Sequence, residues 1–144
     1  MYVVDLNEVE TLPIDERLRV AFPVSSATGT AASATVWINI APGGEVAEHT
    51  DTAEELLYLV QGEVEAAVGD EIGTLRAGDL AVVPAMAPHS FRNLGDEEAR
   101  ILGFFAGSTN VGTFTRPVGN TGARVFVIGG PVPIMLPLEE AATV

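Results

Sequence analysis

The chain contains neither cysteine nor lysine among its 144 residues. Without cysteine it has no disulfide framework, no thiolate metal site and no cysteine nucleophile. Without lysine, Schiff-base chemistry and the lysine-dependent phosphate loop are also excluded. Imidazole nitrogens and carboxylate oxygens remain as the side-chain groups that most often bind divalent metals.

Basic residues are few, since 7 arginines stand against 20 acids and give a net charge of −13. Such a surface repels phosphate backbones and anionic bilayers, so we expect neither nucleic acid nor a membrane as a partner. No apolar run is long enough to cross a bilayer, and the first residues, Met1–Glu8, carry acids where a secretion signal carries bases. A cytoplasmic protein is the simplest interpretation.

Helix patterns are scarce, whereas short apolar or alternating runs recur along the chain and are separated by Gly, Pro, Asp and Asn. Many short strands at this spacing favour an all-β, antiparallel sandwich or barrel. We expect one domain over residues 1–144, with a core at about 33–128 and extensions at both ends. Residues 25–33 are expected to form a loop and Leu138–Thr143 a short terminal turn. The predicted strands are Ser33–Ala41, Leu56–Val60, Glu63–Val68, Ile72–Leu75, Leu80–Val83, Ser90–Asn93, Arg100–Phe105, Val111–Arg116 and Arg124–Ile128.

The two histidines of the chain, His49 and His89, each lie in a strand-like segment. A lone histidine is more often a hydrogen-bonded structural residue than a ligand, but here the flanking residues recur at fixed spacings. Residues two apart in a strand point to the same side, so His49 and Asp51 can approach one ion. The two spaced patterns are Gly43-(five)-His49-Thr50-Asp51-(three)-Glu55-(six)-Gly62 and Gly78-(five)-Pro84-(four)-His89-(three)-Asn93.

These two patterns resemble the paired motifs of the cupin superfamily, and the resemblance covers roughly residues 41–105. It implies a cupin-type antiparallel jelly-roll β-barrel with a metal ion in the barrel mouth. It also implies His49, Asp51, Glu55 and His89 as the metal ligands.

The chain departs from the family motifs at two positions. Asp51 stands where the family's second histidine is usual, and Met86 stands where a turn glycine is usual. Met86 either reshapes the turn or brings a thioether to the cavity entrance. Asp51 is either a fourth ligand or an acceptor that holds an imidazole in one tautomer. The alternative is that the loss of one histidine has emptied the site.

Two histidines and one carboxylate form the donor set of non-haem iron(II) oxygenases, here His49, His89 and Glu55. The additional oxygen of Asp51 favours one divalent ion of the harder kind, which is Fe(II), Mn or Zn rather than copper, with Ni possible. We therefore expect a metal-dependent dioxygenase-type oxidoreductase. The alternatives are a metal-dependent cyclase, isomerase or lyase with Glu55 or Asp51 as proton carrier, and a non-catalytic binding or sensing barrel.

Strand parity predicts what surrounds the ion. If Glu55 faces inward, Leu57 and Leu59 do too, and Phe91 accompanies His89. Trp37, or its neighbours Val36 and Ile38, would line the same interior, and Met86 its entrance. Such a cavity would take a small apolar or aromatic substrate with a chelating pair of oxygens. Taken individually, Leu57 and Phe91 read as packed core.

The outer edges of a small barrel favour association, and we expect a homodimer. The apolar, proline-containing segment Ile128–Leu138 is a candidate for docking on a neighbouring molecule, or for covering its own barrel.

Overall fold

The computed structural model describes residues 1–129 and the backbone of 134–136. Within these ranges the chain is built from β-strands and one 3₁₀ helix, η1 (Ser26–Thr28), and none of its helical structure could cross a membrane. The strands are β1 (Leu12–Pro13), β2 (Leu18–Ala21), β3 (Ala34–Ile40), β4 (Glu45–Asp51), β5 (Glu55–Gln61), β6 (Glu63–Val68), β7 (Glu71–Arg76), β8 (Leu80–Val83), β9 (His89–Arg92), β10 (Ala99–Phe105), β11 (Asn110–Phe114), β12 (Val125–Ile128) and β13 (Ile134–Leu136).

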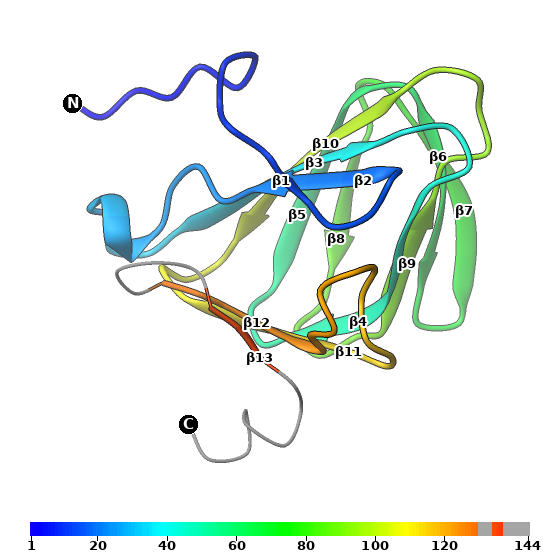
Figure 1. Cartoon of the computed structure of the whole chain (residues 1–144). Helices are drawn as coiled ribbons and strands as arrows, with labels where there is room; N and C mark the ends of the chain where they lie inside the picture. The colour runs from blue at the N-terminus through cyan, green and yellow to red at the C-terminus, as the bar shows by residue number, and fades with distance from the viewer. Residues whose placement is uncertain (130–133, 137–144) are drawn as a thin grey trace.

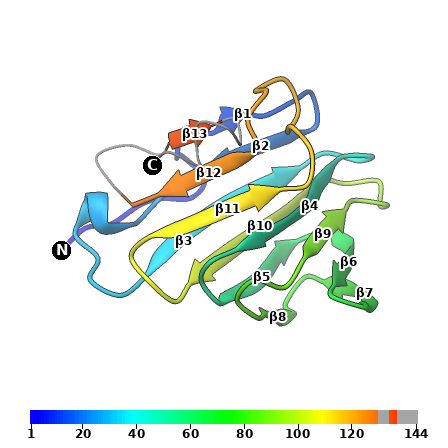
Figure 2. The ribbon, with the colours of Figure 1, turned by 90° about the horizontal axis from the view of Figure 1, so that it is seen from below.

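The strands form two antiparallel sheets that face each other (Figure 1). Buried apolar side chains from both sheets make up the core. One sheet has the order β1-β2-β3-β10-β5-β8, and the other has the order β13-β12-β11-β4-β9-β6-β7. Because neighbours within each sheet come from distant parts of the chain, the connections cross between the sheets, as they do in a jelly roll (Figure 2). The expected all-β, antiparallel jelly-roll fold is therefore confirmed.

All nine predicted strands are present with shifts of at most two residues at their ends, but β1, β2, β4 and β13 were not among them. β4 reads Glu-Val-Ala-Glu-His-Thr-Asp, so its inner face carries a histidine and an aspartate instead of an apolar row. Apolar alternation could not reveal such a strand. The expected loop at 25–33 contains η1, which Ser25 caps. The expected terminal turn at 138–143 lies outside the described residues, as does most of the segment 128–138.

β5 shows how one strand divides its side chains between the interior and the surface. Glu55, Leu57 and Leu59 are buried, whereas Leu56 and Tyr58 are exposed. The predicted parity of this strand is thus confirmed. The inward leucines join a core that extends through β3, β9 and β10.

β4 contains an irregularity that aligns the two histidines. Val46 pairs with Phe91, but the register then shifts, and His49 pairs directly with His89. The extra residue of this β-bulge lets Val46 and His49, three positions apart, both face the interior. Regular alternation from Val46 would have directed His49 to the surface.

Candidate metal centre

Four buried ionisable side chains meet at the inner face of the barrel. His49 and Asp51 come from β4, Glu55 begins β5, and His89 begins β9. Their exposed fractions are 8%, 4%, 2% and 1%, respectively. The structure therefore brings together every residue that the two motifs single out as a ligand.

The two histidines are held in the same way. Nδ1 of His49 lies 2.8 Å from the carbonyl oxygen of Ala47, and Nδ1 of His89 lies 2.9 Å from that of Ala87. A carbonyl oxygen can only accept, so in both rings Nδ1 carries the hydrogen and donates it. In the neutral rings Nε2 then bears the lone pair, which is the form that binds a metal.

The Nε2 atoms point at the carboxylates. Oδ2 of Asp51 lies 3.5 Å from Nε2 of His49 and 3.1 Å from Nε2 of His89. Oε1 of Glu55 lies 3.5 Å from Nε2 of His89. Ligand atoms held at about 2.1 Å from one ion lie roughly 3.0–3.4 Å apart for right-angled or tetrahedral coordination. The separations at this site are close to those of ligands around one ion.

His49, Asp51 and His89 form the tightest group, with one ligand atom of each within 4.8 Å of the others. Glu55 stands at its side, next to His89 alone. The sequence ranked Glu55 ahead of Asp51 as the carboxylate of the triad. In the structure Asp51 occupies the central place, since it reaches both imidazoles.

Two atoms of this group test whether a cation fits. Asp51 Oδ2 and His89 Nε2 are buried, and neither has a hydrogen-bond partner among the described residues. A buried acceptor without a partner costs about 1–3 kcal/mol, and two lone pairs at this distance repel each other. A cation between them, either a proton or a metal ion, removes both penalties. The residues present therefore fit a bound divalent ion.

The two histidines differ sharply in basicity. Burial, together with the neighbouring His89, lowers the pKa of His49 to about 4. Burial alone would also lower the pKa of His89, but the adjacent carboxylates of Asp51 and Glu55 raise it to about 10. Near neutral pH and without metal, His49 is neutral and His89 is the protonated ring.

The two carboxylates differ as well. Burial would raise the pKa of Asp51, but His89, His49 and a hydrogen bond from Asn110 hold it below its ordinary value. Burial raises the pKa of Glu55 to about 7, with a further contribution from the charge of Asp51. Asp51 is thus a permanent anion, whereas Glu55 can gain or lose a proton under ordinary conditions.

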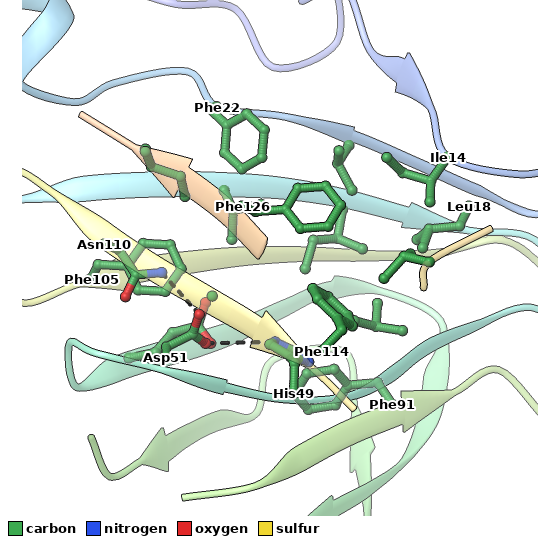
Figure 3. Close-up of a pocket in the computed structure, with 18 residues that line it drawn as sticks. Ile14, Leu18, Phe22, His49, Asp51, Phe91, Phe105, Asn110, Phe114 and Phe126 are labelled. Carbon is green, nitrogen blue, oxygen red and sulfur yellow. Dashed lines mark hydrogen bonds and ion pairs between the residues drawn. The ribbon is translucent and has the colours of Figure 1, made fainter. Parts of the chain in front are cut away.

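Asn110 is a site residue that the sequence patterns did not identify. Its Nδ2 donates to Oδ1 of Asp51 over 2.8 Å (Figure 3). Its own Oδ1 accepts from the backbone N–H of Ala53 over 3.1 Å. This buried amide fixes the carboxylate so that Oδ2 faces the histidines. It lies 59 positions after Asp51. An asparagine next to a turn gives no sequence sign of such a role.

Two glycines make room for the carboxylates. A Cβ at Gly112 would lie 3.0 Å from Oδ1 of Asp51, and one at Gly103 would collide with Oε2 of Glu55. Gly112 pairs with Asp51 between β11 and β4, so the close approach follows from the register. These glycines allow two charged side chains to lie flat against neighbouring strands.

A cavity of about 70 Å³ extends from the metal centre into the barrel. Its walls are almost entirely apolar and include five of the six phenylalanines of the chain. Phe114 stacks on His49 with ring centroids 4.4 Å apart. The lining residues are Ile14, Leu18, Val20, Phe22, Val36, Ile38, Val46, His49, Asp51, Glu55, Phe91, Phe105, Asn110, Gly112, Phe114, Val118, Phe126 and Ile128.

Of the expected pocket residues, Phe91 lines this cavity and four others do not. Leu57 and Leu59 are fully buried in the core and are not among the residues that line the cavity. Trp37 points away from the cavity, which Val36 and Ile38 line instead. These pocket assignments were therefore wrong.

Met86 was also expected near the entrance, but it is 58% exposed and does not line the cavity. Its backbone has a φ of 64°, the left-handed region that glycine adopts at low cost. Met86 thus occupies the turn conformation of the glycine it replaces, and the turn interpretation of this departure agrees with the structure. A strained backbone of this kind costs about 1–3 kcal/mol.

Two curated proteins resemble the central part of the chain. A segment of 62 residues is 40% identical to a protein named polyketide synthase CurC from Streptomyces cyaneus, and it covers 42% of this chain and 40% of that protein. A segment of 64 residues is 36% identical to protein SchB from Streptomyces halstedii, and it covers 44% of this chain and 46% of that protein. The matches therefore span less than half the length of these relatives.

Solved structures of oxalate decarboxylases share the fold. The enzyme of Lactobacillus farciminis, in a formate complex, matches with a TM-score of 0.66 and 26% identity over 72% of this chain and 32% of that chain. The Bacillus subtilis enzyme studied for its Mn(II) centres matches with a TM-score of 0.66 and 23% identity over 72% of this chain and 29% of that chain.

The family assignment rests on the segment that carries both histidines. Residues 36–105 match the Cupin_2 family model, described as a cupin domain. This range runs from within β3 to the end of β10 and includes all four ionisable residues of the metal centre. Residues 36–105 therefore form a cupin domain, and this part of the chain belongs to the cupin superfamily.

Proposed function

We propose that this chain is a metal-dependent cupin enzyme that acts on an apolar, polyketide-like substrate through a pair of chelating oxygens. His49, Asp51 and His89 hold one divalent ion, and Glu55 is a fourth ligand or a proton carrier beside it. The observation that carries the proposal is the buried pair Asp51 Oδ2 and His89 Nε2, which lie 3.1 Å apart and lack hydrogen-bond partners among the described residues.

The donor set supports certain ions over others. Two imidazoles and one or two carboxylates favour Mn, Fe(II) or Zn over copper, and Ni remains compatible. The Bacillus oxalate decarboxylase of the same fold has Mn(II) centres, which makes manganese the first ion to test. When bound, such an ion would supply a Lewis acid for a substrate carbonyl.

The surrounding residues divide the remaining work. The phenylalanine-lined cavity binds the apolar part of the substrate and excludes water from its oxygens. Glu55, which lines this cavity and has a pKa of about 7, accepts or returns a proton near neutral pH. Asn110 keeps the Asp51 carboxylate in place during these steps. A cavity of about 150 Å³ is known to hold benzene, so a ring-sized substrate requires side chains of this smaller one to move.

A non-redox reaction of the cyclase, isomerase or lyase type is the function that we infer first. It is supported by the relative named polyketide synthase CurC and by a buried carboxyl group suited to proton transfer. This reverses the order that the sequence patterns favoured. The oxygenase remains the second candidate, because two histidines with one carboxylate are the donor set of non-haem iron(II) oxygenases.

Two measurements test the proposal. Protein purified without chelators should contain close to one divalent ion per chain, as measured by elemental analysis, and a metal-free protein that also fails to bind added Mn(II), Fe(II) or Zn(II) would refute it. The loaded protein is then incubated with aromatic poly-β-ketones and β-diketones under argon and under air. Turnover under argon supports the non-redox reaction, whereas strict dependence on oxygen, with matching oxygen consumption, supports the oxygenase.

A further inference from the structure

The outer face of β5, β8 and β10 is apolar and exposed. Its members come from the open end of the six-stranded sheet and are in contact through strand pairing. Leu56 pairs with both Val82 and Phe104, and Tyr58 pairs with Leu80. We call this the β5–β8 face, and its residues are Leu56, Tyr58, Val60, Leu80, Val82 and Phe104, each between 37% and 62% exposed.

The sequence of β5 itself indicates that both of its faces are covered. A strand with one face in water usually alternates apolar and polar residues, whereas a strand buried on both sides is apolar throughout. After Glu55, β5 continues Leu-Leu-Tyr-Leu-Val without a polar residue until Gln61. The outer face of the other sheet carries exposed charges instead, among them Glu45, Glu63 and Arg92.

The face adjoins an open strand edge. β8 pairs with β5 on one side, and no strand of the described residues lies on its other side. The backbone N–H of Leu59 donates to the carbonyl oxygen of Asp79, and hydrogen-bonded pairs alternate with non-bonded pairs along an antiparallel ladder. Leu80 and Val82 therefore form non-bonded pairs with β5, and their backbone N–H and C=O groups point away from it. Open edges beside apolar faces attract other strands unless a partner covers them.

We propose that a second copy of this chain packs on the β5–β8 face in a two-fold dimer. In a two-fold dimer the same surface of both copies meets, so a charged surface would bring like charges together. Because the chain carries a net charge of −13, repulsion between carboxylates disfavours most of its surface as such an interface. The outward residues of β5 and β8, two strands that the structure describes in full, include no charged side chain.

The size of the face agrees with a dimer core. Six side chains of these types and exposures offer roughly 500 Å² of apolar surface, which is near the upper range of apolar patches on monomers. A standard interface buries about 800 Å² on each partner, of which the central part is apolar and the rim polar. The β5–β8 face supplies that central part, and the inference is independent of the metal centre.

The first experiment measures the mass of the full chain in solution by sedimentation. The wild type should sediment as a dimer of twice 15.0 kDa at micromolar concentration. The double variant Leu80→Glu with Val82→Glu should dissociate roughly a hundredfold or more readily, because four carboxylates would meet across the axis. Leu94→Glu is the matched control, since Leu94 is 64% exposed against 62% for Leu80 and lies between β9 and β10, outside the face.

The second experiment uses the absence of cysteine. Val82→Cys should form a disulfide-linked dimer under mild oxidation, whereas Leu94→Cys should not, and each variant carries no other thiol. A wild type that stays at 15.0 kDa up to about 0.1 mM would overturn the proposal. So would a double glutamate variant that remains a dimer, or cross-linking that is no faster at Val82 than at Leu94.

Discussion

The two ends of the cavity draw on different parts of the chain. The polar end consists of His49, Asp51, Glu55 and His89, which all lie within the cupin domain at residues 36–105. The apolar end also takes side chains from the flanking segments, with Leu18 and Phe22 before the domain and Phe126 after it, beside residues of the domain such as Phe91 and Phe105 (Figure 3). The domain therefore holds all four ionisable groups, and the flanks complete the apolar wall.

The largest effect should follow from removing an imidazole at the polar end. Binding of a structural metal by four ligands is worth about 10–16 kcal/mol, so loss of one ligand should weaken binding on the order of a thousandfold. We expect His49→Ala and His89→Ala to lose the metal during purification, as measured by elemental analysis. Phe126→Leu, a change at the apolar end, should keep it. Equal metal content in all three variants would remove the distinction between the two ends.

A truncation at the apolar end should cost stability instead. Phe126 is buried and packs against Phe114 with ring centroids 5.2 Å apart. Phe126→Ala should lower the free energy of unfolding by about 3–5 kcal/mol, as chemical denaturation would measure. Metal affinity of the folded variant should stay within a few-fold of the wild type, because no ligand moves. A large loss of affinity would mean that the two ends are coupled.

Asn110 should have an intermediate effect, since it touches the polar end through Asp51 alone. Groups that orient metal ligands typically contribute 10–100-fold to affinity, and we expect Asn110→Ala to weaken binding by that factor. Competition with a chelator of known affinity measures it. Thr113→Ala is a suitable control from the same strand, because Thr113 does not line the cavity. An unchanged affinity for Asn110→Ala would show that Asp51 needs no positioning.

The smallest signal is the release of protons when metal binds. With a pKa of about 10, His89 must give up a proton, and Glu55, with a pKa of about 7, is half protonated at pH 7. His49, with a pKa of about 4, contributes none. Proton release should therefore lie between one and two per ion at pH 6–7 and fall to about one near pH 8.5. Titration calorimetry in buffers of different ionisation enthalpy measures this count, and a value near zero would contradict the assigned protonation states.

The sequence predicted the polar end more fully than the apolar one. His49 and His89 could be located because each lies in a local pattern of fixed spacing, which a single strand and its turns produce. Phe22 and Phe126 carry no such pattern, since their position depends on how distant strands pair. Asn110 was missed for the same reason. Its role appears only when β11 is placed beside β4.

Parity gave correct directions for β5, but it did not give depth. Leu57 and Leu59 do point inward, yet they are fully buried in the core and do not line the cavity. Parity alone also left the choice between Trp37 and its neighbours open, because it requires a reference residue of known direction. The register between β3 and β10 supplies that reference, and Val36 and Ile38 line the cavity.

The bulge in β4 accommodates one extra residue between Val46 and His49. Deleting one residue between Val46 and His49 would leave them two positions apart, so regular alternation alone would keep the imidazole inward and opposite His89, and the bulge would no longer be needed. Searches for related metal-binding chains should therefore allow a gap of one residue in this short stretch. A homologue that keeps both histidines but is one residue shorter here is expected to keep the site on a strand without a bulge.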